Sequence, residues 1–171
     1  MKYITLIIIS FTFLINTSTA QSDSTTTTTK YKNAIGVTAG FTIGNGLSYR
    51  HSFKKLEIQG SFAPFKDEYS SRYSIGGTFI YKLVEAPKIV FFLYQGNQYI
   101  YTEELVYSGQ SNGDEPVEDK IIESYFNNGI GIGIRFIILK RVGLDIMGGY
   151  ASYNNYSKIS FTGEIGLFFM F

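Results

Sequence analysis

Hydrophobic residues recur at every second position through most of the chain after Tyr31. A period of two is that of a β-strand whose two faces meet different surroundings, whereas an amphipathic helix repeats about every 3.6 residues. The clearest case is the segment 158–171, because Leu167 and Phe169 fall on one face while Glu164 falls on the other. The pattern therefore predicts an all-β protein.

Eight segments show strand character. Seven have a distinct apolar face, within residues 35–41, 47–53, 56–62, 73–83, 130–138, 142–150 and 159–171, and a fifth strand in chain order lies within 88–102. That strand is apolar on both faces up to Gln95, so its register stays open, and a bulge near Gly96 would reconcile its halves. Eight strands, most near the roughly 9 to 11 residues of a tilted spanning strand, predict an eight-stranded antiparallel up-and-down transmembrane β-barrel.

The predicted connections alternate in length along the chain. Short ones fall at 53–55, 85–87 and 139–141, and longer ones at 66–72, 103–125 and 153–157. Outer-membrane barrels have this asymmetry, with tight periplasmic turns and longer external loops. The connection at Gly44-Asn45 departs from it, because two residues of this type predict a tight hairpin.

The distribution of charge indicates which face meets lipid. Outside the uncertain fifth strand, the apolar faces carry no Asp, Glu, Lys or Arg, and the polar faces are mainly Gly, Ser, Thr and Ala. A water-exposed surface is about a quarter to a third charged, whereas charged residues make up only 17% of this chain. We therefore expect the apolar faces to contact lipid and the polar faces to line a narrow lumen. A soluble lipocalin-like carrier, with its apolar face inside, is the alternative.

The charged residues on the polar faces are candidate lumen residues. They are Arg50, Glu57, Lys82, Arg135, Asp145 and Glu164. Buried charges are tolerated when they are paired, so we expect three basic and three acidic side chains to form a network that plugs the barrel. A proton or ion path is the functional alternative.

The predicted external loop 103–125 is strongly acidic. It contains Glu103, Glu104, Asp114, Glu115, Glu118, Asp119 and Glu123 against the single Lys120. The acidic residues lack the regular ligand spacing of a calcium loop, so no metal site is predicted. A charge run of this kind indicates a solvated surface that faces an extracellular ligand or a partner protein.

The first thirty-one residues precede the predicted barrel of residues 32–171. Residues 1–20 have the order of a signal peptide, with Lys2, an apolar run at 4–15 and a small-residue cleavage site. The Thr-rich segment 21–31 has almost no apolar residue to bury, which predicts a flexible tether. Asp23-Ser24-Thr25 resembles a short O-glycosylation sequon of Bacteroidetes-like bacteria, although we expect an unmodified linker.

The last strand carries a more specific resemblance. Residues 158–171 end on Phe171, with Phe169 at the alternate position. This pattern resembles the carboxy-terminal signal that the barrel-assembly machinery reads, and residues 32–171 as a whole resemble small eight-stranded barrels of the OmpX and OmpA-barrel type. The resemblance implies location in the cell outer membrane, with outer-membrane lipid and the assembly machinery as partners. It implies no single activity.

Catalytic chemistry finds little support in the sequence. The chain has no cysteine, and its one histidine, His51, is predicted on the lipid side, where it is a poor general base. Net charge near +1 argues against a nucleic-acid partner. We therefore expect no catalytic residue, no cofactor and a structural or adhesive role through the external loops. An outer-membrane lipid-modifying enzyme and the soluble periplasmic carrier are the alternatives.

Overall fold

The structure is a computed structural model, which describes residues 31–66, 70–108 and 117–171. The predicted signal peptide and the predicted tether up to residue 30 lie outside the described residues. The described strands are β1 (Asn33–Ala39), β2 (Gly46–Phe53), β3 (Leu56–Lys66), β4 (Ser70–Glu85), β5 (Ile89–Ser108), β6 (Val117–Ile137), β7 (Val142–Tyr153) and β8 (Lys158–Met170). In this part of the chain, no helix is long and apolar enough to cross a membrane.

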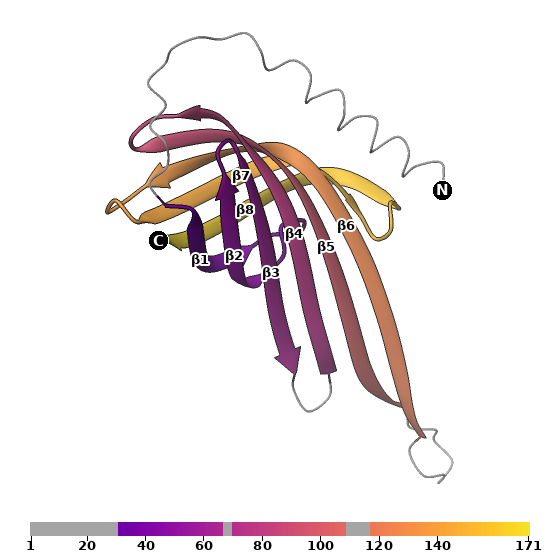
Figure 1. The fold of residues 1–171 in the computed structure, drawn as a ribbon. Coiled ribbons are helices and arrows are strands. Elements are labelled where there is room, and N and C mark those ends of the chain that lie inside the picture. Colours follow the sequence, from indigo (N-terminus) through magenta and orange to yellow (C-terminus); the bar gives the residue numbers. More distant parts are fainter. Residues whose placement is uncertain (1–30, 67–69, 109–116) are drawn as a thin grey trace.

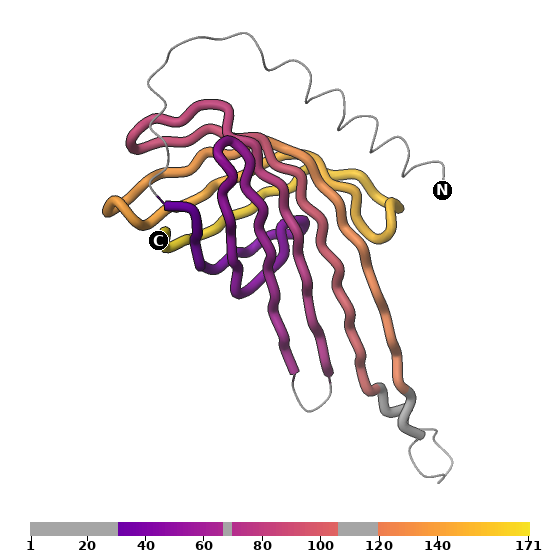
Figure 2. The backbone as a smooth tube through the Cα atoms, in the orientation of Figure 1, coloured from indigo at the N-terminus to yellow at the C-terminus, as the bar shows by residue number. Residues whose placement is uncertain are grey.

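The eight strands form one closed antiparallel barrel. Each strand pairs with the next in the sequence, and β8 pairs with β1 through partners such as Ile35 and Phe169. Neighbouring strands lie side by side in chain order in Figure 1, and Figure 2 traces the same up-and-down path. The prediction of an eight-stranded antiparallel barrel is confirmed.

Side chains alternate between the lumen and the outer surface, as the period of two requires. On the outer surface Ile35 is 51% exposed, Leu47 68% and Ile132 67%, whereas the lumen-facing Asp145 is 0% exposed. The apolar faces therefore point outward and the sparse charges point inward. This is the orientation expected from the charge distribution and the reverse of a carrier with an apolar interior.

The register of β5 is settled by its pairing with β6. Phe92 and Tyr94 point into the lumen, and the ladder runs without a break from Ile89 opposite Phe136 to the end of the strand. The predicted bulge near Gly96 is therefore wrong. The irregularity lies in β4 instead, where the register with β5 shifts between Lys82 and Val84.

The connection between β1 and β2 is not the predicted two-residue hairpin. Residues 40–45, which we call the inner loop, fold into the lumen, where Thr42 and Ile43 are both 0% exposed. Glycines on the wall make the space, since a Cβ at Gly96 would lie 2.8 Å from Thr42 O and one at Gly129 2.7 Å from Thr42 Cγ2. The sequence pattern missed this insertion because Phe41 faces outward, at the position where an outward residue of β1 would be expected if the strand continued.

The prediction that residues 103–125 form a loop is also wrong, because the described parts of this segment are paired strands. Strands β5 and β6 stay paired from Gln98 opposite Asn127 to Ser108 opposite Val117. Strand β7 stops pairing with β6 at Asn128, and β4 stops pairing with β5 at Glu104, so β5 and β6 continue beyond their neighbours as a hairpin. We call residues 101–108 and 117–124 the arm, which reaches furthest from the barrel in Figure 1. Polarity indicated a loop, whereas a ladder of backbone hydrogen bonds tolerates polar side chains.

We predict that Gly96→Ala lowers the free energy of unfolding by about 1 to 3 kcal/mol, because the added methyl would overpack against the backbone of the inner loop. The matched control is Gly163→Ala, whose Cβ would meet nothing within 4 Å. Urea titration of both refolded variants, followed by circular dichroism, measures the difference. Equal midpoints for the two variants would contradict the tight packing of this loop.

Candidate functional site

Five of the six predicted lumen charges meet in one cluster. Arg50, Glu57, Lys82, Arg135 and Asp145 come from five different strands, and each is at most 3% exposed. We call these five residues the ion network. Their positions lie close to the short turns that follow β2, β4 and β6, and therefore at the barrel end where β1 begins and β8 ends.

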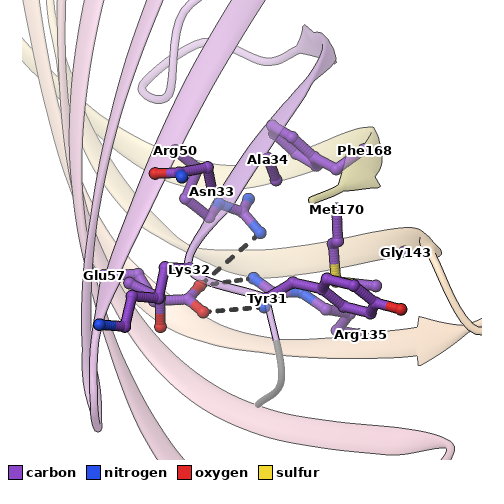
Figure 3. A pocket seen from close by; sticks show the side chains of 11 residues that line it. Tyr31, Lys32, Asn33, Ala34, Arg50, Glu57, Arg135, Gly143, Phe168 and Met170 are labelled. Atoms are coloured by element: carbon purple, nitrogen blue, oxygen red, sulfur yellow. Dashed lines mark hydrogen bonds and ion pairs between the residues drawn. The ribbon is translucent and has the colours of Figure 1, made fainter.

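Two guanidinium groups and two carboxylates alternate at the centre of the ion network. Arg135 Nε lies 2.7 Å from Asp145 Oδ1, and Arg135 Nη2 lies 2.8 Å from Glu57 Oε2. Arg50 Nη2 lies 2.7 Å from Asp145 Oδ2, and Arg50 Nη1 lies 3.7 Å from Glu57 Oε2. Figure 3 shows both arginines directed at Glu57. Each charge has an opposite charge beside it, which is the condition for burial.

Lys82 extends the ion network to a residue that the sequence analysis missed. Its Nζ lies 3.9 Å from Glu57 Oε1 and 3.2 Å from Glu85 Oε2. Glu85 was assigned to a turn, but β4 includes it. Its position three residues after Lys82 was the available signal in the sequence, and the register shift between Lys82 and Val84 lies between the two.

Aromatic rings and a small cavity complete this end of the lumen. The Arg50 guanidinium lies 3.8 Å from the ring centroid of Phe168, a cation–π contact. Beside it is a cavity of about 20 Å³, lined by Tyr31 and Met170 among others. A volume of this size holds about one water molecule. The space beside Arg50 is therefore small.

Glu164 does not join the ion network, in contrast to the expected pairing. Its carboxylate accepts hydrogen bonds from Thr42 Oγ1, from Thr162 Oγ1 at 3.1 Å and from the backbone N of Ile43 at 3.1 Å. None of the ion pairs between described side chains includes it. The cause is position, because the inner loop folds against Glu164 and offers donors in place of a cation.

Further contacts hold the inner loop in the lumen. Asn127 Nδ2 donates to Phe41 O at 3.0 Å, and Ser61 Oγ donates to Ile43 O at 2.7 Å. Apolar side chains surround Ile43 in a buried cluster. Its other members are Ile80, Val90, Phe92, Tyr94 and Met147. The inner loop and this cluster therefore lie inside the barrel, on the side of Glu164.

The acidic residues of the predicted loop are distributed along the arm. Glu103 Oε1 lies 2.9 Å from Lys120 Nζ across the two strands, and Glu123 accepts a hydrogen bond from Tyr125. The hydrogen bond from Lys120, with a second one from Tyr101, holds the pKa of Glu103 below its ordinary value. Glu104 is exposed. Asp114 and Glu115 lie outside the described residues, and so do the side chains of Glu118 and Asp119.

One edge of the arm is unpaired over part of β6. Asn155, in the turn between β7 and β8, binds both backbone groups of Phe126, accepting from N at 3.1 Å and donating to O at 3.0 Å. Backbone groups alternate in direction along a strand, so those of Ser124, Ile122 and Lys120 also point away from β5. Asn155 Nδ2 donates a long hydrogen bond to Ser124 O at 3.5 Å, so the open part begins at Ile122. From Asn127 to the tip of β6, no described strand pairs with this side of β6, while β5 pairs with its other side. The arm therefore presents an open strand edge.

The candidate assembly signal and the histidine lie at the outer surface. Phe169 and Phe171 are 46% and 51% exposed, and backbone hydrogen bonds join Phe171 to Asn33 at the start of β1. His51 Nδ1 lies 2.7 Å from Asn33 Oδ1, and its ring packs edge-on against Phe53. Across residues 31–66, 70–108 and 117–171, no group of acidic or histidine side chains is arranged to hold a metal ion.

Comparison with known proteins adds fold likenesses to this geometry. No family model matches the chain, and no curated protein sequence matches it. In fold, the chain is an eight-stranded up-and-down barrel, as its resemblance to the OmpX and OmpA-barrel type implies.

Three solved structures are similar to the chain, each over 81% of its length. The N-terminal β-barrel domain of Pseudomonas aeruginosa OprF is 15% identical, with 94% of that chain covered and a TM-score of 0.47. Neisserial surface protein A is 16% identical, with 93% covered and a TM-score of 0.47. Ail, the attachment invasion locus protein of Yersinia pestis, is 16% identical, with 93% covered and a TM-score of 0.41. The fold class rests on the pairing of the chain's own strands.

We predict that Asp145→Asn lowers the free energy of unfolding by about 3 to 5 kcal/mol, because it leaves two buried guanidinium groups with one carboxylate fewer. Glu104→Gln, on the exposed surface of the arm, is the control and should change stability by less than about 0.5 kcal/mol. Urea midpoints of the refolded proteins give the comparison. A similar shift of the urea midpoint in both variants would show that the ion network does not contribute more to stability than an exposed charge.

Proposed function

We propose that this chain is a bacterial outer-membrane barrel with a closed lumen, which binds a partner protein through the open edge of the arm. The observation that carries the proposal is that the barrel has its apolar side chains outside and its charges inside, the reverse of a soluble protein. A role in binding follows from the same arrangement, because a filled lumen leaves the external surface as the part that can meet a partner.

The outer wall supports a membrane location. Exposed Ile, Leu, Val, Phe and Tyr side chains come from all eight strands. Soluble monomers rarely expose contiguous apolar patches larger than a few hundred Å². In hydrocarbon, a closed barrel satisfies every backbone group of its wall through neighbouring strands, whereas an open sheet does not. The predicted signal peptide and the carboxy-terminal aromatic pattern favour the outer membrane over other membranes.

Aromatic residues give the wall a height that suits a bilayer. On β5, Phe91 and Tyr99 both face outward and lie eight positions apart. With a rise of roughly 3.3 Å per residue and a tilt of about 40°, they are separated by about 20 Å along the barrel axis. An outer-membrane barrel has an apolar band of about 25 Å between two aromatic girdles. The two residues therefore fit the two girdles.

The filled lumen supports a binding or structural role over transport. The ion network occupies one end, and the inner loop with the cluster around Ile43 occupies the rest. In our proposal these groups act together as a plug that no solute passes.

The arm supports binding by strand addition. The open edge of β6 offers backbone donors and acceptors at alternate residues, and an extended segment of a partner can pair with them as an additional strand. Ile121 and Ile122 are 47% and 56% exposed beside this edge and can contact apolar side chains of that strand. The excess of acidic residues in 103–125 favours a basic partner, since charge complementarity directs association.

Protease added to whole cells tests location and topology together. We expect cleavage confined to residues 103–125, because the arm projects from the barrel while the wall is protected by lipid. The protected fragments should remain in the membrane fraction after a urea wash. Release of the protein by osmotic shock would instead indicate a soluble periplasmic protein and would overturn the proposal.

Ile122→Pro tests binding at the open edge. Proline lacks the N–H that would bond an added strand, yet it is tolerated on an edge that has no partner. Ile122→Ala is the matched control, because it removes the side chain and keeps the N–H. A synthetic peptide of alternating lysine and valine is the probe, and fluorescence anisotropy with the detergent-solubilised protein is the readout.

We expect the proline variant to bind the peptide at least tenfold more weakly than the native protein and the alanine variant at most threefold more weakly. A proline variant that binds as tightly as the native protein would exclude strand addition at this edge.

A further inference from the structure

Three amide side chains lie on the outer wall, where most of the surrounding side chains are apolar, although Ser152 is opposite Asn128. Gln95 and Asn97 belong to β5 and Asn128 to β6, and all three face outward and are partly exposed. Asn128 Nδ2 donates to Asn97 Oδ1 at 2.6 Å, and Asn97 Nδ2 donates to Gln95 Oε1 at 3.2 Å. We call these three residues the amide ladder.

The amide ladder runs from the middle of the apolar band at Gln95 toward the girdle at Tyr99, because Asn97 is two positions from Tyr99 and Asn128 is opposite Ser152, the second-last residue of β7. Gln95 is four positions from Phe91 and four from Tyr99, the two outward aromatics of β5. With the same rise of roughly 3.3 Å per residue and tilt of about 40°, Gln95 lies about 10 Å from Phe91 and from Tyr99 along the barrel axis, near the middle of the apolar band. Amide groups in hydrocarbon are unfavourable unless they are hydrogen-bonded, so their presence at this depth requires an explanation.

Bonds within the amide ladder satisfy only part of its hydrogen-bonding capacity. Each amide has two N–H donors and an oxygen with two lone pairs. Among the hydrogen bonds between described residues, Asn128 Oδ1 accepts none, and Gln95 Nε2 makes only a long contact of 3.5 Å with Gly96 O. The patch therefore keeps donors and acceptors that no hydrogen bond between described residues fully satisfies.

Two glycines continue the amide ladder into a shallow stripe. Gly77 on β4 is opposite Asn97, and Gly60 on β3 is opposite Gly77. Both face outward, and a Cβ at either would meet nothing within 4 Å. Gly60 also lines an apolar groove of about 430 Å³ between Tyr49, Phe62 and neighbouring residues. Small residues on a membrane-facing surface let another backbone approach closely.

We propose that this stripe, from Gly60 through Gly77 and Asn97 to Asn128, is the interface through which two copies of the chain associate in the membrane. The inference rests on the membrane location proposed above and goes beyond it.

A second copy fits the stripe better than other occupants. A two-fold axis along the membrane normal brings each residue to the same depth as its counterpart, so Asn97 and Asn128 of one copy meet the same pair on the other. An amide both donates and accepts, which makes this patch complementary to itself. Lipid tails offer no hydrogen bond, and lipid headgroups lie at the surface of the bilayer.

A pair of glycine-to-cysteine variants provides the test, because the chain has no cysteine of its own. Gly77→Cys places one thiol in the stripe, and Gly163→Cys, on β8, is the matched control. Each replaces an outward glycine with open space around it, away from the lumen. The full chain is expressed in cells, and washed outer membranes are treated with copper phenanthroline or a short thiol-to-thiol crosslinker.

We expect Gly77→Cys to give a crosslinked species of twice the chain's mass and Gly163→Cys to remain monomeric. Adding Asn97→Val and Asn128→Val to the Gly77→Cys chain should reduce the crosslinked fraction at least fivefold. Valine is compatible with a lipid-facing strand, so the amount of protein in the membrane fraction should stay the same.

Three results would overturn the dimer. The first is equal crosslinking of the two cysteine variants, and the second is a crosslinked fraction that the valine substitutions leave unchanged. The third is a crosslinked species whose mass shows that the partner is a different protein. Failure of the membrane location would be seen separately, as loss of all variants from the washed membranes. An inserted protein without crosslinks would therefore overturn the interface alone.

Discussion

The pairing of β8 with β1 is the interaction on which the rest of the structure depends. It removes the two free edges that an eight-stranded sheet would otherwise have, so the wall has no unpaired strand along the shared height of the barrel. Closure also divides all side chains into an inner and an outer set, because successive residues point to opposite faces. The apolar outer wall, the buried charges and the limited lumen all follow from that division.

A narrow lumen makes the inner set crowded. Charges placed there have to compensate one another, and the two arginines and two carboxylates at the centre of the ion network do so directly. Where no cation is near, at Glu164, the inner loop supplies hydroxyl and backbone donors. The buried acidic groups are therefore compensated in two different ways, by arginine side chains at one end of the barrel and by an inserted backbone segment at Glu164.

Strand periodicity and charge distribution predicted the fold and the direction of its faces, because both depend on local alternation. They also identified the five residues of the ion network, since few charges lie on the polar faces. Features that depend on contacts between distant segments were missed. The inner loop needs space from Gly96 and Gly129, which only the closed barrel brings to Thr42. The arm was taken for a loop because its polarity concealed a ladder of backbone hydrogen bonds.

The partition of the ion network among the strands has a consequence for assembly. Arg50 and Glu57 come from the hairpin of β2 and β3, and Arg135 and Asp145 face each other across the hairpin of β6 and β7. Each hairpin thus brings one positive and one negative group of its own. Each hairpin can therefore be desolvated without burying an isolated charge. The contacts between Arg50 and Asp145 and between Arg135 and Glu57 join the two hairpins and form only when the barrel closes.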